Sequence, residues 1–213
     1  HRSIIIPQLA APGVAAFMVR KLSGFEAIFG PVRAVDLAAF MDRGMNATDE
    51  MRRVQFPMAD RAALIPIELI SALRTAGFPL IVLLMISGFN GPHSYWENVR
   101  TGGFFAFSAA IAALLSGNVA VPLFLPWLPG RSFALKGLTA GLLVFVLLIV
   151  TGGFGSTASP SILEHLAWLL ILPAVSSYYG MNFTGSSTYT SLSGVRKEMR
   201  IALPLQIAGG AGG

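Results

Sequence analysis

The sequence predicts an α/β domain with a parallel sheet, followed by an all-α bundle of transmembrane helices. Hydrophobic residues make up 54% of the 213 residues and charged residues only 12%, whereas a soluble domain carries about 25% charged residues. The mean hydropathy is +0.68. Nine of the fifteen Lys and Arg residues and seven of the ten acids lie before Thr75. This imbalance predicts an α/β domain over residues 1–61 and a transmembrane domain over residues 62–213.

Two strands joined by a helix are predicted first. Residues 3–7 (SIIIP) are β-branched and apolar, which predicts a buried strand, and residues 25–29 predict a second one. Between them, Pro12 suits the first turn of a helix because proline lacks the amide hydrogen that would be unpaired there. Gly24 is a suitable C-terminal cap. One apolar helical face is formed by Val14, Phe17, Met18 and Leu22.

A second helix and a third strand are predicted next. Residues 30–33 (GPVR) form a turn, and Gly44 ends the helix. The apolar face of that helix consists of Ala34, Leu37, Ala38 and Met41. Residues 46–50 are polar, and residues 53–56 predict the third strand. The order strand, helix, strand, helix, strand implies parallel pairing with right-handed crossovers.

The segments that follow the first two strands are candidate ligand contacts. In open α/β sheets, ligands lie beyond the carboxyl ends of the strands. Residues 7–13 and 30–33 occupy those positions and are rich in Gly and Pro, so a ligand could approach the backbone closely. The alternative is that both segments are ordinary tight turns.

Four segments are long and apolar enough to span a membrane, which takes about 20 residues. They cover about 66–88, a stretch within 101–128, about 133–151 and about 162–179. A fifth helix is predicted to start at Ile201 and to stop before spanning. Within 137–141, Gly137 and Gly141 have the G-x-x-x-G spacing that allows close helix packing, although Gly is common in membrane helices.

The charges of the connections predict the orientation. Residues 129–137 carry Arg131 and Lys136, and residues 180–200 carry three basic residues, whereas residues 89–103 carry one and residues 152–161 none. Because basic residues favour the cytoplasmic side, this alternation predicts a multi-pass protein of the cell inner (cytoplasmic) membrane with a cytoplasmic N-terminal domain. Basic residues placed in this way do not indicate a nucleic-acid partner.

Ionisable groups within the predicted spans are few and lie toward the segment ends, where long side chains reach water. They are Glu68, Arg74, Glu164 and His165, and a structural role is favoured for each. A hydroxyl-rich, uncharged stretch over residues 182–193 is interpreted as a polar loop or as part of a substrate path. The sequence contains no metal-ligand cluster, no Ser/His/Asp arrangement, no phosphate loop and no Cys.

Four strings together resemble the membrane-anchored corrinoid proteins of microbial mercury methylation, the HgcA family. They are residues 4–16 (IIIPQLAAPGVAA), 23–40 (SGFEAIFGPVRAVDLAAF), 44–53 (GMNATDEMRR) and 180–199 (GMNFTGSSTYTSLSGVRKEM). The Pro-Gln-Leu and Gly-Pro-Val-Arg-Ala elements are also similar to the corrinoid subunit of the carbon monoxide dehydrogenase/acetyl-CoA synthase system. The resemblance extends over essentially the whole chain.

The resemblance implies a Rossmann-like cobalamin-binding domain in the cytoplasm and a five-helix membrane domain. It implies a corrinoid methyltransferase that passes a methyl group from cobalt to Hg(II), forming methylmercury. The implied partners are a methyl donor, membrane lipid and HgcB, a ferredoxin-like iron–sulfur protein that returns cobalt to Co(I). By position, the resemblance makes seven residues candidates for contact with the corrin: Gln8, Ala11, Pro12, Gly13, Gly30, Pro31 and Arg33.

One departure from that family concerns the cobalt ligand. The family has a Cys within an Asn-Val-Trp-Cys-Ala motif, and this sequence has no Cys. The motif would lie before residue 1, so the chain is expected to be an inactive fragment, and no catalytic residue is assigned. Two other hypotheses are a polytopic membrane transporter or anchor subunit with a cytoplasmic α/β domain, and a corrinoid-binding module without chemistry.

Overall fold

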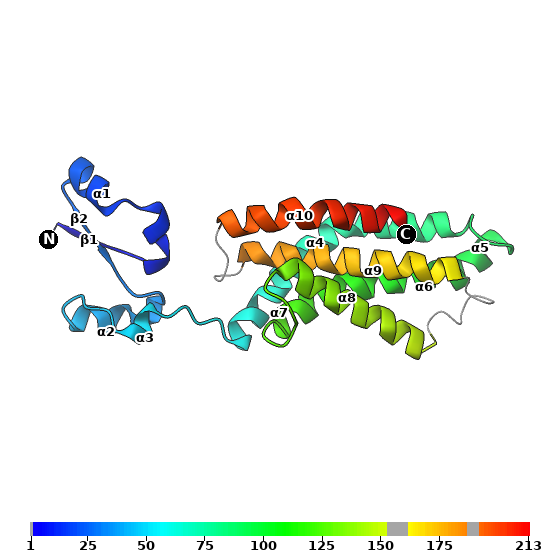
Figure 1. Ribbon diagram of the computed structural model, residues 1–213, viewed down its shortest axis with the longest axis horizontal. Helices are drawn as coiled ribbons and strands as arrows, with labels where there is room; N and C mark the ends of the chain where they lie inside the picture. Colours follow the sequence, from blue (N-terminus) through cyan, green and yellow to red (C-terminus); the bar gives the residue numbers. More distant parts are fainter. Residues whose placement is uncertain (1, 153–161, 187–191) are drawn as a thin grey trace. The chain divides into compact units, whose positions relative to one another are not determined.

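The computed structural model describes residues 2–152, 162–186 and 192–213 (Figure 1). The chain divides into two compact units, His1–Gln55 and Phe56–Gly213. The first unit holds a two-stranded sheet and short helices, and the second consists of long helices. The molecule is therefore mostly helical.

The sheet of the first unit pairs β1 (Ser3–Ile6) with β2 (Glu26–Phe29) in parallel, with Ser3 opposite Glu26 and Ile6 opposite Phe29. Two parallel strands need a crossover connection, and here it consists of the 3-10 helix η1 (Gln8–Gly13) and of α1 (Ala16–Ser23). The parallel pairing predicted for the first two strands is confirmed.

The predicted start of the first helix at Pro12 is wrong. Pro12 lies in η1, whose first turn is closed by the Ala10 N–H donating to Pro7 O (2.9 Å). Helix α1 begins only at Ala16 and ends at Gly24, which has a left-handed φ of 74° that glycine adopts without steric cost. Its apolar face is not covered within this unit, since Phe17 is 72% exposed.

The predicted third strand over residues 53–56 is also wrong. After β2 the chain forms η2 (Ala34–Asp36), α2 (Leu37–Asp42) and α3 (Asp49–Arg52), and the sheet of the described residues keeps two strands. Phe56 instead stacks on Phe183 of the helical unit, with ring centroids 6.2 Å apart. Residues 54–57 form neither helix nor strand. A Rossmann-like domain therefore stays a prediction.

Four spans of the second unit are long and apolar enough to cross a membrane, which confirms the four predicted ones. They are α4 (Met58–Ser87), the second span over Tyr95–Leu123, α8 (Phe133–Val150) and α9 (Ile162–Asn182). Helix α9 is followed by the 3-10 helix η6 (Phe183–Ser186). With 30 residues, α4 is about 45 Å long at 1.5 Å per residue.

The second span is not a uniform α-helix. Two wide π turns, η3 (Val99–Gly103) and η4 (Ser116–Ala120), interrupt it. Its α-helical parts are α5 (Tyr95–Asn98), α6 (Phe104–Leu115) and α7 (Val121–Leu123). Such turns occur mostly as single wide turns within α-helices.

The last helix, α10 (Leu192–Gly212), begins well before the predicted start at Ile201. Its first turns carry charged residues, and one of them has a defined role: Glu198 Oε1 accepts a hydrogen bond from the Ala134 N–H at the start of α8 (2.6 Å). A carboxylate is favourable at a helix N-terminus. Helix α10 runs alongside α9 (Figure 1).

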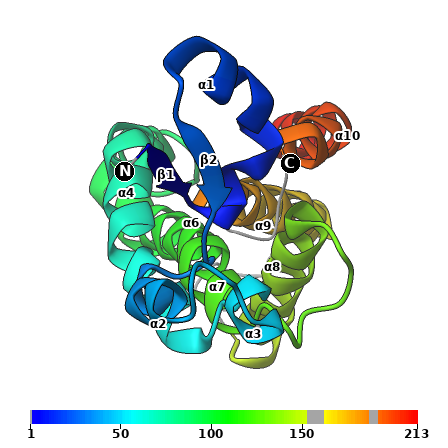
Figure 2. The same ribbon diagram turned by 90° about the vertical axis from the view of Figure 1, so that its left-hand side faces the viewer.

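Helix α9 is the central element of the bundle, in contact with α8, α10 and α6 (Figure 2). One apolar cluster joins α6, α8 and α9, where Phe105 and Trp168 meet edge to face with ring centroids 5.5 Å apart. A second cluster, nearer the start of α8, contains Val121, Phe133 and Phe183. Helix α4 buries few residues and presents apolar side chains outward, as a lipid-facing helix does.

Candidate functional site

The carboxyl ends of β1 and β2 meet at one edge of the sheet. Ile6 pairs with Phe29 as the last residue of each strand, and the Gly30 N–H donates to Ile6 O (2.8 Å). The segments that follow, Gln8–Gly13 and residues 30–33, therefore both leave from this edge. An arrangement with the two segments at opposite ends of the sheet would have excluded a shared site.

Two of the candidate residues at this edge are buried and serve packing. Gly30 and Pro31 have little contact with solvent. A Cβ added to Gly30 would lie 2.7 Å from Ile5 Cγ2 and 3.8 Å from Phe40 Cε1. Phe40 is fully buried. Glycine is thus needed at position 30 because side chains of β1 and α2 lie close to the backbone there. Gly30 therefore has a packing role at this edge of the sheet.

Four candidate residues are more accessible. Ala11, Pro12 and Gly13 are exposed on η1, and Gln8 is half-buried at its start. A Cβ added to Gly13 would meet no atom within 4 Å. A ligand can approach the backbone closely at such a position. The exposed end of η1 is the part of the predicted site that a planar ligand can reach.

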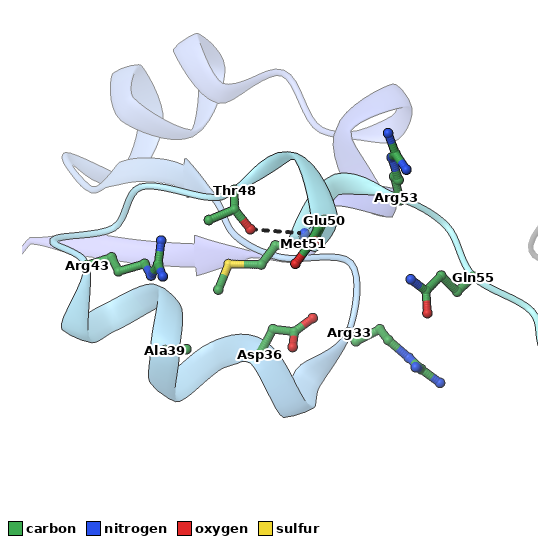
Figure 3. A pocket seen from close by; sticks show the side chains of 9 residues that line it. All are labelled: Arg33, Asp36, Ala39, Arg43, Thr48, Glu50, Met51, Arg53 and Gln55. Atoms are coloured by element: carbon green, nitrogen blue, oxygen red, sulfur yellow. Dashed lines mark hydrogen bonds between the residues drawn. The ribbon is translucent and has the colours of Figure 1, made fainter.

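Arg33 lies in a separate pocket of the same unit (Figure 3). The pocket has a volume of about 300 Å³, and its side chains come from the η2–α2 segment on one side and from α3 and the residues after it on the other. The backbone supports this arrangement, since the Val32 N–H donates to Met51 O (2.9 Å). The Thr48 hydroxyl caps α3 by accepting from the Met51 N–H (3.4 Å).

The pocket is polar and carries charges of both signs. Its charged residues are Arg33, Arg43 and Arg53 against Asp36 and Glu50. Guanidinium groups donate and carboxylates accept hydrogen bonds, so the pocket suits a ligand group that does both, such as a primary amide. Sequence reasoning named only Arg33. The signal that it missed was the mixture of four arginines and four acids over residues 33–53.

These residues fit the periphery of a corrinoid, and they do not fit its metal. A volume of about 300 Å³ is at the lower limit of ligand pockets, so it would hold an amide side arm and not the macrocycle. The open surface of η1 would lie against the ring. The four nitrogens of the corrin ring hold the cobalt, so a protein would add only an axial ligand. The resemblance implies a Cys thiolate for that ligand, and the sequence has no Cys.

The bundle contains buried polar residues that sequence reasoning did not single out. They are Arg61, Asn98, Ser116, Asn118, Ser176, Ser177 and Gln206. The signal for most of them was a polar residue inside an otherwise apolar helix. Thr184, also buried, belongs to the hydroxyl-rich stretch over residues 182–193 that the sequence did single out. The four ionisable residues that were named are less buried: Arg74 is exposed, while Glu68, Glu164 and His165 are half-buried.

Comparisons with known proteins assign no family to the chain. No family model matches it, no curated protein matches it, and no solved structure matches it. Function is therefore argued from the residues and their arrangement.

Proposed function

We propose that this chain supplies a corrinoid-contacting edge and the membrane anchor of a methyltransferase that passes a methyl group from cobalt to Hg(II), forming methylmercury. The observation that supports the proposal is the parallel pairing of β1 and β2, which brings Gln8–Gly13 and Gly30 to one edge of the sheet. These segments lie within two of the four strings that carry the resemblance to the HgcA family, residues 4–16 and 23–40.

The residues of this chain would bind and orient the corrinoid. Ala11, Pro12 and Gly13 would lie against the ring, because they are exposed and Gly13 leaves open space. Arg33 and its pocket would hold an amide side arm. The corrinoid, when bound, supplies the cobalt-carried methyl group. The thiolate that the resemblance implies below cobalt is not among these residues, so none of them is given a catalytic role.

The bundle would place this reaction at the cytoplasmic membrane, with the α/β unit on the cytoplasmic side. Four spans are long and apolar enough for that role. A reduced iron–sulfur protein of the HgcB type would be the electron-donating partner. The two basic connections, which contain Arg131 and Arg196, support the orientation through the positive-inside rule.

The proposal is tested by equilibrium dialysis of the full chain, in a neutral detergent, against hydroxocobalamin. The unmodified chain should retain the corrinoid. The substitution Ala11→Trp should reduce retention at least tenfold, since it fills the surface against which the ring would lie. The matched control is Ala38→Trp, because Ala38 is an equally exposed alanine on α2 and does not line the pocket.

Two results would contradict the proposal. One is no retention by an unmodified chain whose circular dichroism shows intact helices. The other is an equal loss of retention in both tryptophan variants, which would show that the η1 surface does not carry the binding. An anchor or transporter without corrinoid chemistry would then be the better interpretation.

A further inference from the structure

A basic pocket lies at one end of the bundle, where the second span ends. Its volume is about 600 Å³. Three cationic residues, Arg61, Arg131 and Lys136, line it. The apolar side chains in its lining include Phe56, Leu125 and Phe133. Of the described residues that line this pocket, none is an Asp or a Glu. All ten Asp and Glu residues of the sequence lie in the described ranges, so no carboxylate side chain of the chain lines this pocket.

Arg61 is the most buried cation of this pocket, with 5% of its surface exposed. Its Nη1 donates to Pro122 O (2.9 Å) and Leu123 O (3.1 Å), the carbonyls at the end of the second span. Its Nε is buried and has no hydrogen-bond partner among the described residues. A buried charge that meets only carbonyl dipoles is costly, and a neighbouring anion would offset that cost.

Lys136 is held in a similar way. Its Nζ donates to Leu125 O (2.6 Å) and Leu128 O (2.7 Å), carbonyls of the connection between α7 and α8. Arg131, on the same connection, is exposed. The three side chains therefore bring three positive charges to one pocket. Guanidinium and ammonium groups are the groups with which proteins bind phosphate.

Aromatic residues place this pocket at the membrane surface. Trp127, on the connection beside the pocket, is 68% exposed and lies next to Phe124, with ring centroids 6.1 Å apart. Exposed Trp and Tyr residues mark the boundary between lipid and water. The opposite end of the second span begins with Tyr95 and the exposed Trp96. The 29 residues of this span measure about 43 Å at 1.5 Å per residue, close to the full thickness of a bilayer with its headgroups.

We propose that this pocket binds an anionic phospholipid, with the phosphate of the headgroup against Arg61, Arg131 and Lys136. The apolar part of the lining, which includes Phe56, Leu125 and Phe133, would contact the part of the acyl chains nearest to the headgroup. Basic pockets between membrane helices are known to bind such headgroups. This lining favours a lipid over free phosphate, which would gain nothing from the apolar side. The proposal does not depend on the corrinoid function.

The test uses the purified full chain in dodecyl maltoside, mixed with equal amounts of phosphatidylglycerol and phosphatidylcholine of the same acyl chains. Native mass spectrometry counts the lipids retained. Phosphatidylglycerol should be retained preferentially. The substitution Arg131→Gln should weaken its binding about fivefold, the effect of one basic residue near an anionic headgroup. Arg131→Lys should restore most of it, and circular dichroism should show intact helices in both variants.

The matched control is Arg100→Gln, which removes the same charge from an exposed position near the start of the second span. It should leave the retention of phosphatidylglycerol unchanged. Equal retention of the two lipids by the unmodified chain would overturn the proposal, as would an equal loss in both glutamine variants. Displacement of phosphatidylglycerol by millimolar inorganic phosphate would also overturn it, in favour of a soluble phosphate ligand.

Discussion

At the scale of single residues, two buried polar side chains, Ser177 and Gln206, join helices α8, α9 and α10. The Ser177 hydroxyl, on α9, donates to Ala134 O of α8 (2.9 Å). Gln206 of α10 is 8% exposed and donates from Nε2 to Ser177 Oγ (2.9 Å). A second hydroxyl of α9, on Ser176, is hydrogen-bonded to Ser116 Oγ of the second span. Hydrogen bonds of this kind between membrane helices are worth about 0.6 kcal/mol on average.

The Gln206 amide is only half satisfied, because its Oε1 is buried without a partner among the described residues. We expect Ser177→Ala to lower the free energy of unfolding by about 1–2 kcal/mol, since it also leaves the Gln206 donor without its acceptor. Gln206→Met should cost less, because it removes the donor and the unpaired acceptor together. Unfolding in mixed micelles with increasing dodecyl sulfate, followed by circular dichroism, measures both.

The double variant completes a thermodynamic cycle. If Ser177 and Gln206 interact as described, Ser177→Ala should cost less in the Gln206→Met background than in the unmodified chain. Strictly additive costs would show that the hydrogen bond between Ser177 and Gln206 contributes nothing to the attachment of α10.

At the scale of elements, α8 and α9 owe their contact to glycine. Gly137 and Gly141 are buried on the face of α8 that meets α9. A Cβ added to Gly137 would lie 2.5 Å from Ser176 O, and one added to Gly141 would lie 2.6 Å from Pro173 Cα. Lipid tails are as apolar as side chains, so membrane helices associate through close packing rather than through exclusion of water. The G-x-x-x-G spacing is therefore a packing motif in this chain.

Gly137→Ala should destabilise the bundle by about 1–3 kcal/mol, the usual cost of overpacking, because backbone atoms of α9 occupy the required space. The matched control is Gly77→Ala on α4, where an added Cβ would meet no atom within 4 Å. That change should stabilise slightly, by up to about 1 kcal/mol, through helix propensity. Melting temperatures in detergent would distinguish them. Equal shifts in both variants would contradict the packing role of Gly137.

At the scale of the whole molecule, the bundle has a basic end and an end with little charge. The basic end carries Arg61, Arg131 and Lys136 around one pocket. It also holds the charged start of α10, since Glu198 reaches the first turn of α8. At the opposite end, the first turns of the second span carry Glu97 and Arg100, and the first turn of α9 carries Glu164. The positive-inside rule predicts that the basic end faces the cytoplasm.

The absence of Cys from the chain makes this orientation easy to test. Asn90→Cys places one thiol on the exposed connection after α4, and Pro129→Cys places one on the exposed connection before α8. A membrane-impermeant maleimide applied to intact cells should label the first variant and not the second. Permeabilised cells should be labelled in both. Labelling of Pro129→Cys in intact cells would reverse the orientation and remove the support for a cytoplasmic α/β unit.

The sequence was sufficient to predict the four membrane spans, but it predicted the elements around them less accurately. Long apolar stretches predicted four of the helices because spanning requires little beyond length and composition. The starts of α4 and α10 were missed because the predicted spans were limited to apolar stretches. Both helices begin with charged turns, in which Arg61 and Glu198 have partners at helix ends. The third strand was predicted over residues 53–56 from local sequence, in which the aromatic contact of Phe56 with Phe183 is not visible.

For the candidate site, the sequence predicted that two segments follow neighbouring strands, and parallel pairing then placed them at one edge. It could not predict that Gly30 and Pro31 are buried there, since that depends on Ile5 and Phe40 packing across the fold. It also could not predict the pocket of Arg33, because the pocket's opposite wall comes from α3 and the residues after it.

The π turn at Ser116–Ala120 has a consequence for the path of a single stripe of residues along the second span. Phe105, Ala109, Ala113, Gly117 and Val121 follow one another at every fourth position, and all are buried. In a regular α-helix each such step advances about 40° beyond a full circle, since each residue turns about 100°. A π turn contains more residues per revolution, so each residue in it turns by less than about 100°. The smaller rotation cancels the drift, and the same stripe of residues faces the interior from α6 to α7.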